Sequence, residues 1–134
     1  MKIKFKSIAD HSVDTDKNII EFEAESEFEI FTDNSNNESI EYLTYQFLEP
    51  SKGIANRIEI NQNQINIFAG DTTLILKKNE KTANSYISVN NQKFVLISLL
   101  HDVEITDNKQ TFKYELFAAN ETLIGKFEIS IERI

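Results

Sequence analysis

The feature that most constrains the fold is a regular alternation of apolar and acidic side chains over residues 20–31. One parity carries Ile20, Phe22, Ala24, Phe28 and Ile30, and the other carries Glu21, Glu23, Glu25, Glu27 and Glu29. Successive side chains of a β-strand point to opposite faces, so this period of two predicts one long strand with an apolar face and an acidic face. The stretch is too regular at period two to be a helix.

The N-terminal residues 2–8 alternate in the same way, with Lys2, Lys4 and Lys6 on one parity and Ile3 and Phe5 on the other. Residues 10–18, between the two alternating stretches, are polar and typical of a turn. A hairpin with both apolar faces inward would place the lysines and the glutamates on one outer face. We therefore expect cross-strand Lys–Glu pairs there, on a face that stays acidic because glutamates outnumber lysines.

The rest of the chain is a series of short alternating segments separated by turn-forming residues. The expected strands cover residues 39–49, 54–61, 64–68, 72–78, 86–89, 94–100, 111–117 and 123–134. Residues 39–49 are apolar on both parities, which indicates either strand ends in different environments or a β-bulge. Residues 94–100 are apolar almost throughout and suit a strand buried on both faces or a short helix.

Many short strands and the lack of a convincing amphipathic helix predict an all-β protein, with residues 1–134 forming a single domain. A long meander must hide the edges of its outer strands, and closure into a barrel does so completely. We therefore expect an antiparallel up-and-down β-barrel of about eight to ten strands.

The charge balance limits the possible partners. The chain has 14 Lys and Arg against 22 Asp and Glu, a net charge of −8, which opposes binding to a phosphate backbone or an anionic membrane. There is no cysteine, so disulfides, thiolate zinc sites and cysteine nucleophiles are excluded. The first residues lack the apolar core of a signal peptide, and no apolar run approaches a membrane span. We expect a cytoplasmic protein with no nucleic-acid or membrane partner.

Several strand motifs are shared with one known bacterial family. They are Ile19-Ile20-Glu21-Phe22-Glu23, Tyr42-Leu43-Thr44-Tyr45, Ile67-Phe68-Ala69-Gly70, the lone Tyr86, residues 94–98, Phe112-Lys113-Tyr114-Glu115-Leu116 and Phe127-Glu128-Ile129-Ser130-Ile131. In these motifs the chain resembles the YwiB-like bacterial proteins of unknown function over nearly its whole length. The resemblance implies a calycin-like, lipocalin-type barrel and no particular activity.

Two positions depart from the pattern of that family. Phe68 stands where the family typically has an arginine, and Asn91 stands where it usually has a glycine. If the arginine anchors a ligand or closes the barrel in relatives, that role is absent here or has moved to Arg57.

A metal site finds little support in the acidic residues. Asp14, Asp16, Asn18 and Glu25 partly match a calcium loop, but Ile19 occupies the position that needs a glycine. Glutamates two apart on one strand are separated by roughly 7 Å, too far to share an ion without another strand. We expect no metal and no cofactor.

The histidines, His11 and His101, give a weak case for catalysis or for metal binding beside Asp10. His101 and Asp102 could supply a base and its orienting carboxylate, with Ser98 or Tyr86 as nucleophile. Neighbouring strand residues point to opposite faces, however, so His101 and Asp102 should not meet. We therefore expect no catalytic residues and a non-enzymatic protein.

The aromatic side chains give the leading functional hypothesis. The candidate lining of the barrel interior is Tyr42, Tyr45, Tyr86, Phe94, Phe112 and Tyr114. A small barrel either fills with its own side chains or holds one small ligand, and inward tyrosines would offer that ligand polar groups. The sequence thus predicts a module that binds a small apolar or amphipathic ligand. The alternative is a packed barrel that binds a basic protein or a second copy through its acidic face or an exposed edge.

Overall fold

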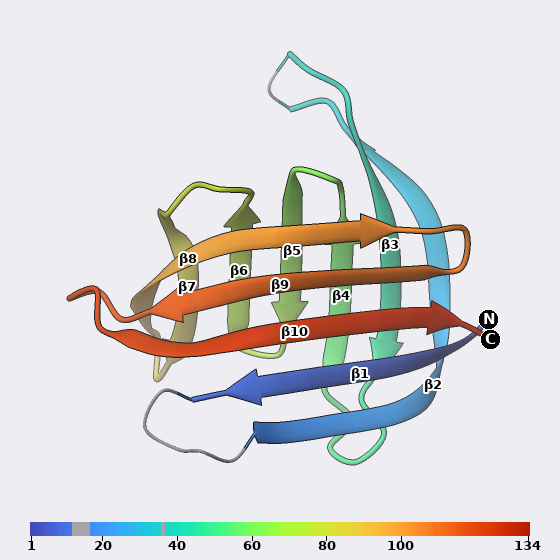
Figure 1. Cartoon of the computed structure of the whole chain (residues 1–134), viewed down its shortest axis with the longest axis horizontal. Coiled ribbons are helices and arrows are strands. Elements are labelled where there is room, and N and C mark those ends of the chain that lie inside the picture. The colour runs from blue at the N-terminus through green and yellow to red at the C-terminus, as the bar shows by residue number, and fades with distance from the viewer. Residues whose placement is uncertain (12–16, 36) are drawn as a thin grey trace.

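The computed structural model describes residues 1–11, 17–35 and 37–134, and these form a chain of β-strands (Figure 1). The strands are β1 (Lys2–Asp10), β2 (Lys17–Asp33), β3 (Ile40–Leu48), β4 (Ala55–Ile60), β5 (Gln64–Ala69), β6 (Thr72–Lys77), β7 (Thr82–Val89), β8 (Gln92–Ile105), β9 (Lys109–Phe117) and β10 (Leu123–Arg133). Within the described residues, no helix is long and apolar enough to cross a membrane.

Each strand pairs antiparallel with the next, and β10 pairs with β1 to close the barrel. The predicted up-and-down barrel is therefore confirmed, with ten strands. In Figure 1, β8, β9, β10 and β1 cross in front of β4, β5 and β6, and β2 bends from the front layer to reach β3 behind it. Every described strand pairs with a neighbour on both sides, although β6 and β7 share only the register pairs Thr72–Ile87 and Thr73–Tyr86.

The outer face of β1 and β2 carries the predicted charge pairs. Lys2 Nζ lies 3.4 Å from Glu23 Oε2, and Lys4 Nζ lies 3.0 Å from Glu21 Oε1. The hydrogen bond from Lys4 lowers the pKa of the Glu21 carboxyl group below its ordinary value. The lysine row thus neutralises part of the glutamate row, as the alternation predicts.

The barrel interior is filled by side chains from every strand. The buried core cluster is Ile3, Phe5, Tyr45, Phe47, Ile58, Ile60, Ile65, Ile67, Leu74, Leu76, Leu96, Leu100, Val103, Phe112, Tyr114, Leu116, Ile129 and Ile131, with Phe22, Ala24, Phe28, Leu43, Ala69, Ile87 and Phe127 packed against it. Aromatic rings meet across neighbouring strands, with centroids 4.9 Å apart for Phe5 and Phe22 and 5.1 Å apart for Tyr114 and Phe127. Burial of these side chains is the main source of stability.

The strand register decides between the alternatives that the sequence leaves open for residues 39–49 and for residues 94–100. Residues of β2 and β3 pair without a shift from Ser26–Phe47 to Asp33–Ile40, so β3 contains no bulge. Its apolar residues are buried on both parities because a second cluster covers its outer face. Residues 94–100 lie within β8 and form a strand. A register shift occurs farther along β8, between Leu100 and Asp102.

Candidate functional site

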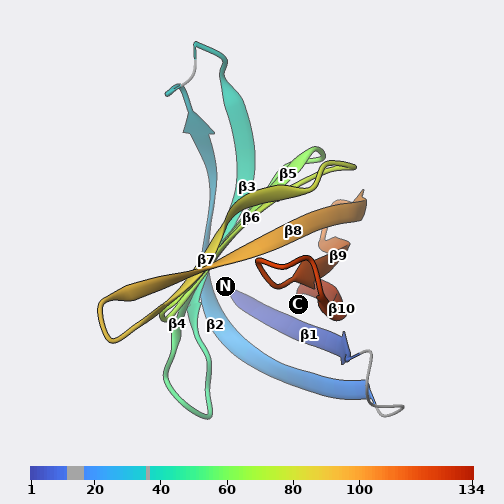
Figure 2. The same cartoon turned by 90° about the vertical axis from the view of Figure 1, so that its left-hand side faces the viewer.

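A cavity of about 710 Å³ opens beside the β2–β3 hairpin, which rises beyond the neighbouring strands (Figures 1 and 2). Its walls are residues 38–41 at the start of β3, residues 61, 63 and 64 at the β4–β5 turn, and residues 77–80 at the end of β6. The volume is in the range of small-molecule pockets in proteins. Segments distant in sequence therefore form a cavity that could hold a small ligand.

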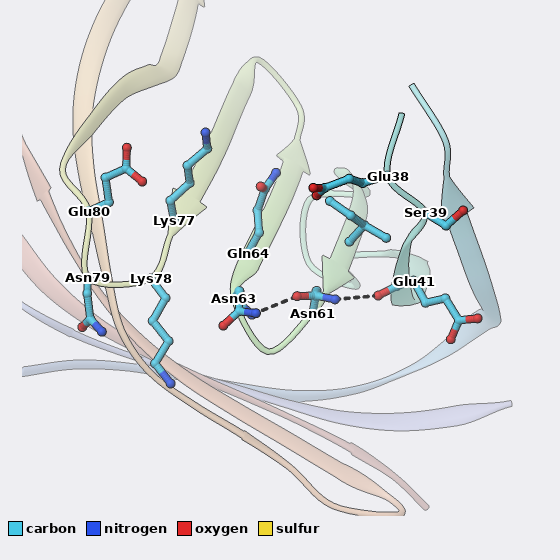
Figure 3. A pocket seen from close by; sticks show the side chains of 11 residues that line it. Glu38, Ser39, Glu41, Asn61, Asn63, Gln64, Lys77, Lys78, Asn79 and Glu80 are labelled. Carbon is cyan, nitrogen blue, oxygen red and sulfur yellow. Dashed lines mark hydrogen bonds between the residues drawn. The ribbon is translucent and has the colours of Figure 1, made fainter. Parts of the chain in front are cut away.

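The cavity presents a cation and an anion with an amide between them. Lys77, Gln64 and Glu38 point toward the same side of it, with Gln64 between the other two (Figure 3). Lys78 and Glu41 point away from that side (Figure 3). Among the described residues, neither Lys77 nor Glu38 takes part in an ion pair. The site thus offers an ammonium group, an amide and a carboxylate to one ligand.

Hydrogen bonds hold the walls of the cavity together. The Asn61 side chain accepts a bond from the Asn63 N–H at 2.9 Å and donates one to the Glu41 carbonyl at 2.9 Å (Figure 3). The Lys78 N–H donates to the Asn63 carbonyl at 3.0 Å. Asn79 follows with φ of 59°, a left-handed conformation that asparagine tolerates in turns. The cavity is therefore built from fixed turns.

A network of hydrogen-bonded polar side chains extends from the cavity along the outer face of β4 and β5. Gln64 Nε2 donates to Asn66 Oδ1 at 3.0 Å, and Asn66 Nδ2 donates to Glu59 Oε1 at 2.9 Å. Arg57 Nε donates to Glu59 Oε2 at 2.8 Å. Glu59 is only 6% exposed, so its charge needs these donors in place of water. The network therefore engages the Gln64 amide nitrogen as a donor.

Aromatic rings cover the same outer face. The rings of Phe31 and Tyr42 stack with centroids 6.3 Å apart, and the Arg57 guanidinium lies 5.2 Å from the Phe31 centroid. Tyr42 is 1% exposed, and burial raises the pKa of its hydroxyl. Sequence reasoning missed this outer cluster, although the apolar residues on both parities of 39–49 were a signal of it.

Three of the aromatic candidates lie in the core. Tyr45, Phe112 and Tyr114 are at most 6% exposed and belong to the buried cluster. The Tyr45 hydroxyl donates to Gln110 Oε1, and Gln110 Nε2 donates to the Thr106 carbonyl at 3.1 Å. Burial raises the pKa of both Tyr45 and Tyr114. These hydroxyls therefore sit among the protein's own side chains.

The expected interior placement does not hold for Tyr42, Tyr86 and Phe94. Leu43 and Ile87 pack against the core, so their neighbours Tyr42 and Tyr86 point to the outer face. Phe94 lies near the start of β8, where the barrel ends, and is 53% exposed. The structure thus separates these three residues from Tyr45, Phe112 and Tyr114.

His101 lies at the irregularity of β8, and its Nε2 makes a close contact with Glu115 Oε1. No hydrogen bond joins it to Asp102 among the described residues. Ser98 is fully buried and donates to the Ile75 carbonyl at 3.0 Å. Tyr86 points outward beneath the Lys93 amine. The proposed base and nucleophiles are therefore engaged with other partners.

His11 Nδ1 lies 3.4 Å from the Ile124 carbonyl, and its ring packs edge-on against Phe127. Asp14 and Asp16 of the possible calcium loop lie outside the described residues. No group of three His, Cys, Asp or Glu residues that could hold a metal ion occurs in the described ranges.

Comparison with known proteins finds a protein of related sequence and a solved structure of similar fold. No family model matches the chain. An uncharacterised protein of Mycoplasmopsis pulmonis (strain UAB CTIP) is 38% identical over 90 residues, which cover 66% of this chain and 71% of that protein. The crystal structure of the ywiB protein from Bacillus subtilis matches with a TM-score of 0.63 at 11% identity, over 98% of this chain and 89% of that one. The second match shows a shared fold.

Proposed function

The chain belongs to the same family as the uncharacterised Mycoplasmopsis pulmonis protein, and we propose that it is a non-enzymatic module that binds a small polar ligand in the cavity beside the β2–β3 hairpin. The observation that carries this proposal is the placement of Lys77 and Glu38 on either side of Gln64 (Figure 3). A zwitterion such as an α-amino acid fits this order of groups. Its carboxylate would meet Lys77, and its ammonium group would meet Glu38.

The position of the ligand follows from how the barrel is filled. Eighteen buried side chains occupy the interior, whereas the 710 Å³ cavity is open on the outside. The cavity lining is mostly charged and amide side chains, so the ligand it favours is polar. This differs from the apolar or amphipathic ligand that the aromatic residues suggest from sequence.

Isothermal titration calorimetry with a panel of α-amino acids, neutral saccharides and dodecanoate tests the proposal. We expect a charged or amide amino acid to bind, and Lys77→Met and Glu38→Gln to weaken binding by roughly tenfold to a hundredfold each, since a charge-assisted hydrogen bond contributes about 1.5–3 kcal/mol. Lys126→Met, on β10 outside this cavity, is the matched control and should bind normally. Equal binding by all variants, or binding of dodecanoate alone, contradicts the proposal.

A second candidate function is protein interaction through the outer glutamates of β2, with a basic protein or a second copy as partner. The filled core supports it, as does Glu27, which belongs to no ion pair of the described residues. Met1, Lys2 and Lys4 already neutralise part of this face, which weakens the case. A salt-sensitive partner lost in Glu27→Lys would favour this function over the first.

We also infer that the protein is a divergent YwiB-like member with a calycin-like barrel. The ten-strand meander and the likeness to the ywiB structure support this placement. Asn91 adds local support, because its φ of 65° suits the glycine that the family pattern has there. A cytoplasmic location is proposed from the lack of cysteine, and cell fractionation tests it.

A further inference from the structure

The outer face of β5, β6, β7 and β8 carries an apolar or aromatic side chain on each of the four strands. Phe68, Ile75, Tyr86, Val95 and Ile97 alternate with core residues of their own strands and therefore point outward. Phe68 and Val95 are 37% and 45% exposed. We refer to these residues as the apolar outer face.

Strand register aligns part of this face into one row. Phe68 pairs with Thr73, Thr73 pairs with Tyr86, and Tyr86 pairs with Val95. Scattered apolar residues on a surface are ordinary, but apolar side chains aligned across neighbouring strands, here with Thr73 between Phe68 and Tyr86, are typical of an interaction site. The outer faces of β1 and β2 carry charged residues at the equivalent positions, such as Lys4 and Glu21. The row is thus a local property of one side of the barrel.

Lysines flank the apolar outer face at two places. Lys93 Nζ lies 4.5 Å from the centroid of the Tyr86 ring, and Lys81 Nζ lies 4.3 Å from that of Phe117, which pairs with Ile97. Among the described residues, neither lysine takes part in an ion pair. Each amine lies over an aromatic ring, a contact that Arg57 and Arg133 also make elsewhere in the protein.

The charges around this face select among possible occupants. A second copy docked through the same face would bring lysines toward lysines, which opposes a symmetric dimer. Nucleic acid binds mainly through its phosphates, and two lysines are too few to hold it against the net charge of −8, whereas a short protein segment can also bind through aliphatic contacts. Asp71 borders Lys93, and Glu80 lies beyond the far end of β6, so the flank is not wholly basic. An apolar centre with amines at its margins best fits aliphatic side chains flanked by carboxylates.

We propose that the apolar outer face docks an acidic protein segment, one whose aliphatic side chains cover Phe68, Tyr86 and Val95 while its carboxylates meet Lys81 and Lys93. None of these residues lines the ligand cavity, so this proposal stands independently of the proposed function.

A random-peptide phage library selected on the immobilised full-length protein tests the proposal. We expect enriched peptides to combine Leu or Ile with Asp or Glu, and a synthetic copy of one to shift the backbone amide signals of Phe68, Tyr86 and Val95 in ¹H–¹⁵N spectra. Enrichment of basic peptides, no enrichment, or shifts confined to other faces would overturn it, as would a dimer formed through this face.

Variants separate docking from general damage to the fold. Val95→Glu and Lys93→Glu should each weaken the selected peptide about tenfold or more, because each replaces a favourable contact with a repulsive charge. Lys93→Gln removes the positive charge without adding a negative one, so it should weaken peptide binding less than Lys93→Glu does. Ile20→Glu, at a position of β2 that is 56% exposed, is the matched control and should bind as the parent does. Glu38→Gln should also leave the peptide affinity unchanged, and equal binding by all variants would refute the site.

Discussion

Buried hydroxyl groups complete the hydrogen bonding of the wall where β6 and β7 separate. The register pairs that join these strands are Thr72–Ile87 and Thr73–Tyr86. Farther along, the Ile75 N–H donates to Ser85 Oγ at 2.9 Å, and Ser98 Oγ donates to the Ile75 carbonyl at 3.0 Å. Ser85 and Ser98 are 1% and 0% exposed, so water cannot take their place.

Ser98→Ala should therefore destabilise the protein by about 0.5–1.5 kcal/mol, because it removes a buried hydrogen bond to the Ile75 carbonyl and leaves the longer one from Thr82 Oγ1, at 3.3 Å. Urea unfolding followed by circular dichroism measures this change. Ser88→Ala, farther along β7 and partly exposed, is the control and should change stability by less than about 0.5 kcal/mol. A Ser98→Ala protein as stable as the parent would show that the hydroxyl bridge does not support the wall.

At the scale of the element, alternation along one strand predicts which side chains face inward where only one face is buried. Phe112 and Leu116 of β9 and Ile129 and Ile131 of β10 lie in the core as their spacing predicts. On β3 alternation is insufficient, because Tyr42 is buried against Phe31 of another strand. Spacing along one strand carries no information about such cross-strand partners.

The candidate cavity is harder still to predict from sequence. Its walls come from three separate turn regions, and their positions depend on hairpin lengths and strand register across the barrel. Lys77, Gln64 and Glu38 carry no motif or common spacing in the sequence. The fold class is therefore readable from the chain, whereas the site requires the three-dimensional structure.

Because only two register pairs join β6 and β7, we expect β7 to be less protected from local opening than strands paired along their whole length. The β7 register shifts between Thr82 and Ser85, and the intervening Ala83 and Asn84 are exposed. Their amide protons should exchange with solvent at least roughly tenfold faster than those of Phe112 and Tyr114 in β9, which is paired on both sides. Native-state hydrogen exchange by NMR measures this difference. Uniform protection across β7 and β9 would contradict it.

At the scale of the whole molecule, one closed barrel presents two different outer surfaces. The outer faces of β1 and β2 carry paired lysines and glutamates, whereas β5, β6, β7 and β8 carry the apolar outer face. The interior between them is filled, including by tyrosines whose hydroxyls are held away from water. Binding activity is consequently expected on the outside of the barrel.

The buried tyrosines make the stability of the whole barrel depend on alkaline pH. Burial raises the pKa of Tyr114 and Tyr45 above the ordinary tyrosine value of about 10. Above that pH the unfolded chain loses protons that the folded protein keeps, so stability is fully present below about pH 10 and falls as pH rises further. Thermal unfolding from neutral to alkaline pH, with tyrosinate absorbance as a second signal, measures this loss. An unchanged melting temperature across that range would contradict the placement of these hydroxyls.

The central claim is that a small ligand binds in the outer cavity while the interior stays occupied by the protein's own side chains. NMR titration with the tightest-binding amino acid and separately with dodecanoate, following backbone amides and side-chain methyl groups together, tests it most directly. We expect the amino acid to shift the amide signals of Gln64, Lys77 and Ser39 and to leave the methyl signals of Leu76, Leu100 and Ile131 unchanged. Dodecanoate that shifts those interior methyl groups, with the cavity amides unmoved by any amino acid, would contradict the account.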